Sequence, residues 1–147
     1  MRTLARKRLP KTIFEFIDGG AQNEISLRAN REDFERYGFR KRVLTDISQR
    51  DQSTTILGEK SASPLILAPT GLAGILHRRG SDVIKALCLG ARACMIGRAW
   101  LYGVASGGEA GVARSLDILT KEIDLALALL GRSRLDELHP EILTARA

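Results

Sequence analysis

Two short apolar runs constrain the fold of this chain more than any other feature. LILA at residues 65–68 is followed by Pro-Thr-Gly, and ACMI at residues 93–96 is followed by Gly-Arg. Apolar runs of this length, ended by turn residues, are typical of strands buried in a parallel sheet. Residues 81–89 between them predict a helix, because polar capping residues open the segment and Gly90 follows its end. Strand, helix and strand in this order indicate an α/β fold.

Further helices are predicted on both sides of this unit. The strongest pattern covers residues 109–130, where apolar residues recur at steps of three and four. Nearer the start of the chain, residues 3–17 predict a helix interrupted by Pro10, and residues 24–36 predict another. The weaker predictions are short strands at residues 39–46 and 53–57 and a short helix ending near Pro140.

Length and composition are those of a single globular domain. The chain has 147 residues, of which 44% are apolar and 27% charged, so we expect a modest core and no disorder. No apolar run approaches the roughly 18 residues of a membrane span. Cys88 and Cys94 stand without further cysteines, so we interpret them as buried thiols of a cytoplasmic protein and expect no metal site.

The net charge of +6 raises the question of a polyanionic partner. A basic cluster spans residues 31–42, but acidic residues alternate with its first members. Such alternation favours a solvated surface. We therefore expect no nucleic acid among the partners.

Several longer segments resemble one enzyme family. KRLPKTIFEFIDGGAQNE, FRKRVL, TTILG and LILAPTGLAG resemble the N-terminal part of the FMN-dependent 2-hydroxy-acid oxidoreductases, which include glycolate oxidase, lactate oxidase and mandelate dehydrogenase. RRGSDVIKALCLGARACMIGRAWLYG and GEAGVARSLDILTKEIDLALALLG resemble the C-terminal part of that family. The two matches together cover nearly the whole chain. The resemblance implies FMN as cofactor, a small 2-hydroxy acid as substrate and a homo-oligomeric assembly.

The resemblance implies a (β/α)₈ barrel without its middle. A complete barrel has typically ~250 residues, whereas this chain has 147. Residues 1–77 match the family through the first barrel strand, and residues 78–147 match it from the loop after the seventh strand. We therefore expect one truncated domain over residues 1–147, an incomplete TIM barrel in which the N-terminal helices and first strand join the last helix–strand–helix units. The deletion junction would lie near residues 77–78.

The resemblance also identifies cofactor positions. Arg78, Gly97 and Arg98 match positions that wrap the FMN phosphate and ribityl chain. The chemistry agrees, because guanidinium groups suit phosphate oxygens and glycine lets backbone N–H groups approach closely. Three further residues match the segment beside the flavin ring: Pro69, Thr70 and Gly71.

No catalytic residue is carried over by the resemblance. The family takes a proton and a hydride equivalent from an α-hydroxy carbon, using a His base, an Arg that binds the carboxylate and a Lys near the flavin. All three lie in the missing middle, and neither His77 nor His139 matches them. Phe16 stands at a substrate-pocket position where many members have Tyr, although we favour simple helix packing for Phe14 and Phe16. We expect this chain alone to be inactive.

Three functions remain open at this point, in decreasing order of preference. The first is a truncated, inactive member of the flavoenzyme family. The second is an interaction module that pairs with an intact homologue or with a chain supplying the missing barrel. The third is a basic surface for a polyanion, which the net charge alone motivates.

The deletion also predicts a rearrangement of the strands. In a closed barrel the first and eighth strands are neighbours, and a helix on the outer face leads forward to the eighth. Here that helix would lead backward, from the first strand to the eighth, and the crossover would be left-handed. Parallel crossovers are right-handed in about 98% of cases. We therefore expect the helix to move to the inner face, or the strands to pair differently or not at all.

Overall fold

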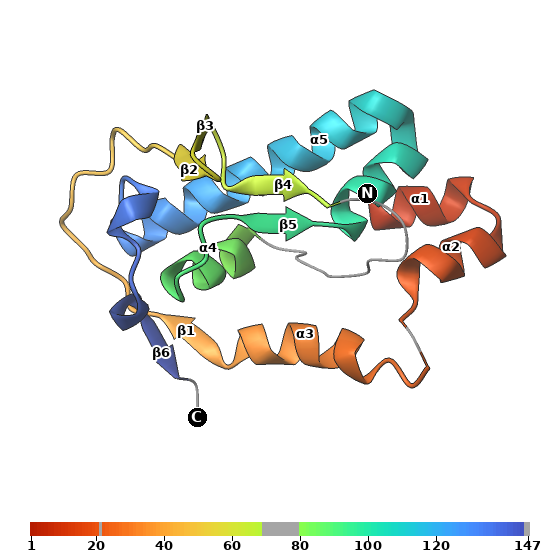
Figure 1. Cartoon of the computed structure of the whole chain (residues 1–147), viewed down its shortest axis with the longest axis horizontal. Helices are drawn as coiled ribbons and strands as arrows, with labels where there is room; N and C mark the ends of the chain where they lie inside the picture. Colours follow the sequence, from red (N-terminus) through yellow and green to blue (C-terminus); the bar gives the residue numbers. More distant parts are fainter. Residues whose placement is uncertain (21, 69–79, 146–147) are drawn as a thin grey trace.

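The structure is a computed structural model that describes residues 1–20, 22–68 and 80–145 (Figure 1). The chain opens with α1 (Arg2–Arg8) and α2 (Lys11–Asp18), which are separated at Pro10 as predicted. Gly19 follows α2 in an extended conformation, and α3 (Ile25–Glu35) comes next. Within the described residues, no helix is long and apolar enough to span a membrane.

The strands of the described residues form three separate pairs. β1 (Tyr37–Phe39) pairs antiparallel with β6 (Leu143–Ala145), and β2 (Thr54–Ile56) pairs antiparallel with β3 (Glu59–Ser61). β4 (Leu65–Leu67) pairs in parallel with β5 (Cys94–Ile96), so that Leu65 lies opposite Cys94 and Leu67 opposite Ile96. These pairs do not join into a closed sheet.

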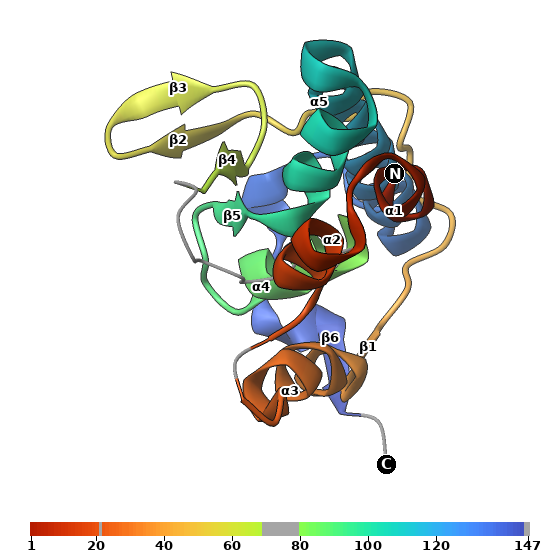
Figure 2. The same ribbon diagram turned by 90° about the vertical axis from the view of Figure 1, so that its right-hand side faces the viewer.

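The parallel pairing of β4 and β5 overturns part of our expectation. The strands were predicted to pair as neighbours only if the intervening helix moved to the other face. They pair in parallel, and α4 (Gly80–Cys88) and α5 (Arg98–Leu130) lie on the same side of them in Figure 2. The prediction of altered or absent pairing is wrong.

The main core lies between α4 and the second half of α5. Ile84 on α4 and Ile123, Leu127 and Leu130 on α5 have at most 1% of their surface exposed. Cys94 of β5 belongs to the same cluster, which ties the strand pair to the two helices. Burial of each aliphatic side chain of this kind contributes about 1.5–3 kcal/mol. The cluster therefore holds α4, α5 and β5 as one unit.

The other face of the β4–β5 pair is open. Met95 is 49% exposed, whereas Cys94 and Ile96, on the opposite face of β5, are buried. Leu67, at the end of β4, lies opposite Ile96 on the helix-facing side and is 46% exposed. The prediction of two buried strands is therefore right for Cys94 and Ile96 and wrong for Met95 and Leu67. Parallel sheets normally have cover on both faces, and among the described residues the face of Met95 has less of it than the helix-facing side.

The helix α5 is longer than its sequence pattern predicts. Its second half corresponds to the predicted helix at residues 109–130, but α5 begins at Arg98, directly after β5. Gly107 and Gly108 interrupt the regular helix between the halves, and Gly108 has φ +58°, which glycine adopts without strain. The first half was missed because its residues, AWLYGVAS, are mostly apolar all round and show no helical period.

Two weaker predictions are wrong in detail. The predicted strand at residues 39–46 ends at Phe39, because the chain then turns onto the end of α5, where the N–H of Arg42 donates to the carbonyl of Leu130 at 3.3 Å. The predicted helix near Pro140 is replaced by two 3₁₀ turns and the strand β6. These turns are η1 (Leu135–Glu137) and η2 (Pro140–Ile142).

The close approach of α4 to α5 gives a first prediction. A Cβ atom at Gly80 would lie 2.5 Å from Cβ of Glu122 and 2.6 Å from the backbone nitrogen of Ile123. We expect Gly80→Ala to lower the free energy of unfolding by about 1–3 kcal/mol, measured by urea denaturation. Gly107→Ala is the matched control, because a Cβ atom there has no neighbour within 4 Å. Equal stability of the two variants would contradict the close contact.

The two cysteines give a second prediction. Cys88 and Cys94 are free and buried, as predicted, and burial raises the pKa of each thiol from 9.0 to about 11. Between these pH values the unfolded chain loses thiol protons that the folded chain keeps. Stability is therefore complete below pH 9 and falls as the pH rises towards 11, by up to about 1.4 kcal/mol per pH unit for each thiol. Urea denaturation across this range should show a shallower decline for the Cys88→Ala/Cys94→Ala variant, and an unchanged slope would refute the assignment.

Candidate functional site

The predicted cofactor positions fall into two groups. Gly97 and Arg98 connect β5 to α5, with Gly97 as the N-cap of the helix. The remaining four lie outside the residues that the structure describes: Pro69, Thr70, Gly71 and Arg78. The site can therefore be built from the β5–α5 junction and its surroundings.

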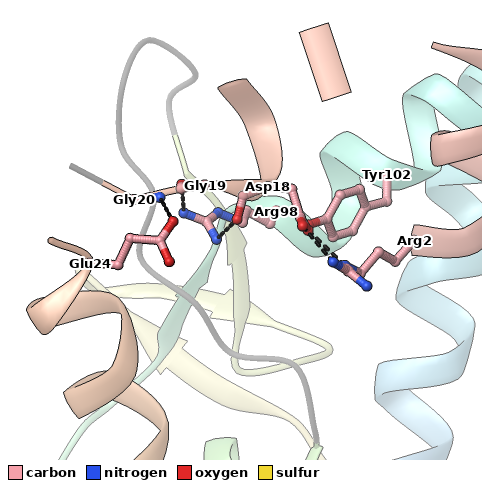
Figure 3. Close-up of polar contacts among 7 residues, drawn as sticks. All are labelled: Arg2, Asp18, Gly19, Gly20, Glu24, Arg98 and Tyr102. Atoms are coloured by element: carbon pink, nitrogen blue, oxygen red, sulfur yellow. Dashed lines mark hydrogen bonds and ion pairs between the residues drawn. The ribbon is translucent and has the colours of Figure 1, made fainter. Parts of the chain in front are cut away.

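Arg98 is buried, with 4% of its surface exposed. Its Nη1 donates a hydrogen bond to the carbonyl of Asp18 at 2.7 Å, and its Nη2 donates to the carbonyl of Gly19 at 2.5 Å (Figure 3). These carbonyls lie at the C-terminal end of α2, where the helix dipole favours a cation. Arg98 therefore ties the start of α5 to the end of α2.

The carboxylate of Asp18 organises the same junction. It accepts two hydrogen bonds from the guanidinium of Arg2, at 2.7 and 2.5 Å, and one from the hydroxyl of Tyr102 (Figure 3). The bond to Asp18 raises the pKa of Arg2, so this guanidinium is charged throughout the ordinary pH range. Paired hydrogen bonds between Arg and a carboxylate fix geometry as well as charge. Residues of α1, α2 and α5 thus meet at one carboxylate.

The start of α5 keeps some features of a phosphate site. No side chain caps its first turn, so the backbone N–H groups that follow Gly97 are available to an anion. Nε of Arg98 is buried and has no hydrogen-bond partner among the described residues. The two Nη atoms, however, are already engaged by α2. The described residues therefore fit a phosphate in part, through backbone N–H groups and one guanidinium N–H.

The two phenylalanines of α2 have different environments. Phe16, predicted at the substrate-pocket position, is 65% exposed, whereas Phe14 is 6% exposed. The ring of Phe14 stacks on that of Tyr102 with centroids 6.3 Å apart. Helix packing is therefore the right interpretation for Phe14 and the wrong one for Phe16. Sequence reasoning missed Asp18 and Tyr102, although a carboxylate in the last turn of a helix opposes the dipole and signals a partner elsewhere.

Of the two histidines, only His139 is among the described residues, and it lies away from this junction. Arg98 begins the 33-residue helix α5, whereas His139 follows the other end of that helix. Nε2 of His139 is 3.4 Å from Nη2 of Arg132, and its Nδ1 is 3.9 Å from Oε2 of Glu141. In the part of the chain that the structure describes, no group of three His, Cys, Asp or Glu residues could hold a metal ion.

The hydrogen bonds that join Arg98 to the end of α2 give a third prediction. We expect Arg98→Met to lower the free energy of unfolding by about 2–3 kcal/mol, because two hydrogen bonds from a buried charge are lost. Arg98→Lys should lie between this variant and the parent, since a lysine lacks the planar fork. Arg92→Met, at an exposed position, serves as the control. Thermal unfolding that is equal for all of these variants would contradict a structural role for Arg98.

Comparisons with known proteins place these residues in a family. The family model for FMN-dependent dehydrogenases matches residues 5–79 and 77–145. The chain is 48% identical to L-lactate dehydrogenase of Alcaligenes faecalis over 79 residues, and 44% identical to a peroxisomal (S)-2-hydroxy-acid oxidase of Oryza sativa subsp. indica over 93 residues. The matches cover 54% and 63% of this chain but only 21% and 25% of these relatives. The chain thus spans about a quarter or less of the length of the curated relatives it matches.

Solved structures show the same fold. A soluble mutant of the membrane-associated (S)-mandelate dehydrogenase from Pseudomonas putida superposes with a TM-score of 0.93 at 18% identity, and the alignment covers 99% of this chain and 98% of that chain. A sulfite-bound flavocytochrome b2 variant gives a TM-score of 0.90 at 16% identity, with coverage of 97% and 84%. The fold is therefore an incomplete (β/α)₈ barrel, as predicted.

The shared fold also indicates on which side of the β4–β5 pair the helix α4 lies. Helices form the outer ring of such a barrel, and α4 keeps the side of the strand pair on which α5 lies (Figure 2). α4 therefore stays on the side of the strand pair that α5 covers, and the expectation that it moves to the other face is wrong. With two matched segments over most of its length and this shared fold, the chain belongs to the family of FMN-dependent 2-hydroxy-acid dehydrogenases and oxidases.

Proposed function

We propose that this chain is a truncated 2-hydroxy-acid oxidoreductase that no longer turns over substrate by itself. The ancestral reaction oxidises an α-hydroxy acid to a 2-oxo acid, and FMN, the family cofactor, accepts the electrons. The observation that carries the proposal is the division of the family match into residues 5–79 and 77–145, which meet at the expected junction near residues 77–78. Residues 1–147 then form one truncated domain.

In this proposal the chain keeps part of an FMN site. Gly97 and Arg98 would hold the phosphate, together with Arg78, and Pro69, Thr70 and Gly71 would lie beside the ring; only the first two are among the described residues. Support comes from the uncapped start of α5 and from the unpaired Nε of Arg98. Because both Nη atoms of Arg98 bind the end of α2, we expect FMN binding to be weak.

Loss of activity follows from the residues that are missing. The family resemblance places the His base, the Arg that binds the carboxylate and the Lys near the flavin outside this chain. Phe16 has no hydroxyl to donate to a substrate, and its ring is largely exposed to solvent.

An interaction module is the second candidate function. β4 and β5 pair only with each other among the described strands, and Met95 of β5 is 49% exposed, which favours a partner that supplies further strands and cover. Two-stranded sheets are marginal on their own, and exposed strand edges pair readily with other chains. An intact homologue or a chain carrying the missing barrel would meet this requirement. The two free thiols support a reducing compartment such as the cytoplasm.

Activity assays give the fourth prediction. We expect no FMN-dependent oxidation of lactate, glycolate or mandelate by the purified chain, measured by reduction of an artificial electron acceptor. Loss of a positioned base alone costs roughly 10²–10⁴-fold in rate, and here several groups are missing together. L-lactate dehydrogenase of Alcaligenes faecalis is the positive control. Turnover that scales with the concentration of this chain would refute inactivity.

Binding of FMN is measured in the same preparation. We expect flavin to separate from the protein on gel filtration, because the described residues provide only part of a phosphate site. Co-purification with an intact homologue would favour the interaction module over an isolated remnant. A yellow protein that retains flavin through the column would contradict the weak site proposed for Gly97 and Arg98.

A further inference from the structure

We propose that residues 40–44, Arg-Lys-Arg-Val-Leu, bind the surface of an anionic lipid bilayer. Three consecutive cationic residues are followed there by two aliphatic residues, and all five are exposed. The segment between β1 and β2 runs along the outside of the molecule in both views (Figures 1 and 2). This inference uses none of the residues proposed for the FMN site.

The backbone of this segment is anchored while its side chains remain free. The N–H of Arg40 donates to the carbonyl of Ile142 at 2.6 Å, and the N–H of Arg42 donates to the carbonyl of Leu130 at 3.3 Å. The hydroxyl of Thr45 donates to the carbonyl of Val43 at 3.5 Å. Because the main chain is held against the end of α5 and the turn η2, the side chains are presented from a fixed base.

The three cations of the segment are available to an external anion. Some exposed arginines elsewhere pair with carboxylates, as Arg36 does with Asp33 at 3.2 Å and Arg134 with Asp136 at 2.9 Å. Among the described residues, no carboxylate pairs with Arg40, Lys41 or Arg42. The carboxylate of Asp46, close by in the chain, instead accepts the N–H of Ser48. The local charge is therefore positive and uncompensated.

The two aliphatic side chains of the segment are exposed, and no tight turn of the backbone accounts for it. Val43 is 81% exposed and Leu44 is 104% exposed. Leu44 has φ +57°, a left-handed conformation that is unfavourable for a leucine. Leu57 also has positive φ and full exposure, but it stands beside Gly58 in the tight turn between β2 and β3, where such a conformation is required. No hairpin explains Leu44.

The apolar surface continues from this segment onto α5. A groove of 430 Å³ lies beside Lys41 and is lined by Phe39, Leu125 and Leu129 among others. Leu125 is 59% exposed and Leu129 is 53% exposed. Cations beside exposed aliphatic side chains match the interface of an anionic bilayer, which offers negative headgroups above an apolar layer. A nucleic acid would use the cations and leave Val43 and Leu44 in water, so the bilayer is the partner that uses both.

Sedimentation with vesicles tests the proposal. Phosphatidylcholine vesicles with and without phosphatidylserine are incubated with the full chain, and bound protein is measured in the pellet. We expect binding only to vesicles that contain phosphatidylserine, with affinity falling as salt is raised. Far-UV circular dichroism of each variant confirms that the fold is retained.

Two variants separate the contributions of charge and apolar surface. Neutralising all three cations should weaken binding roughly 100-fold, since each cation near an anionic surface contributes a factor of about five. Replacing both aliphatic residues by serine should weaken binding about tenfold or more. The first variant is Arg40→Gln/Lys41→Gln/Arg42→Gln. Its charge-matched control is Lys7→Gln/Lys11→Gln/Lys60→Gln. The second variant is Val43→Ser/Leu44→Ser, with Leu57→Ser as its control.

A fluorescence measurement keeps the proposal testable if a multiple variant fails to fold. Leu44→Trp should show a blue-shifted emission component on addition of phosphatidylserine vesicles, and Leu57→Trp should not, after subtraction of the signal of Trp100. Absence of binding, or binding that the charge-matched control reduces equally, would overturn the proposal. So would binding to duplex DNA that exceeds binding to the vesicles and is unaffected by Val43→Ser/Leu44→Ser.

Discussion

The packing of α4 against the second half of α5 is the contact on which the rest of this structure depends. Gly80 lets the two helices approach closely at one end, where its N–H donates to the carboxylate of Glu122 at 2.6 Å. Lys85, on α4, donates from Nζ to the carbonyl of Phe34 at 2.6 Å and so attaches α3 to the same unit. β5 packs on this helix pair through Cys94, and β4 is attached through β5. Without the helix pair, a two-stranded parallel sheet would have no cover at all.

This dependence explains why the prediction for the strands failed. The preference for right-handed crossovers arises because a right-twisted strand that feeds a right-handed helix packs back onto the sheet in that hand. In this chain α4 and β5 already share a core with α5, and the residues of that core lie after α4 begins. β4 pairs with the edge of β5, which this core holds in place. Burial of side chains such as Ile84 and Leu127, each worth about 1.5–3 kcal/mol, stabilises that arrangement.

Local patterns predicted the helices well, and the candidate site poorly. The break at Pro10 and the helix at residues 109–130 follow from backbone chemistry and apolar spacing, which are both readable from neighbouring residues. The role of Arg98 is not local: its partners, Asp18 and Gly19, stand about eighty positions away. A phosphate and a helix C-terminus attract the same guanidinium for the same electrostatic reason. The fold pairs Arg98 with two backbone carbonyls, and binding of a phosphate by Arg98 stays a prediction.

Ring closure accounts for the survival of so much of the fold in so short a chain. In a closed barrel the first and last strands are adjacent, so the two ends of the sequence meet in space. In the truncated barrel proposed above, a deletion from the middle would remove strands whose neighbours are mostly one another and would spare the contact between the ends. The pairing of Leu65 with Cys94, and the hydrogen bonds from Arg98 to the end of α2, both join the N-terminal half of this chain to the C-terminal half. Under that proposal the inner cover of β4 and β5 would be missing, in agreement with the 49% exposure of Met95 beside the fully buried Ile96.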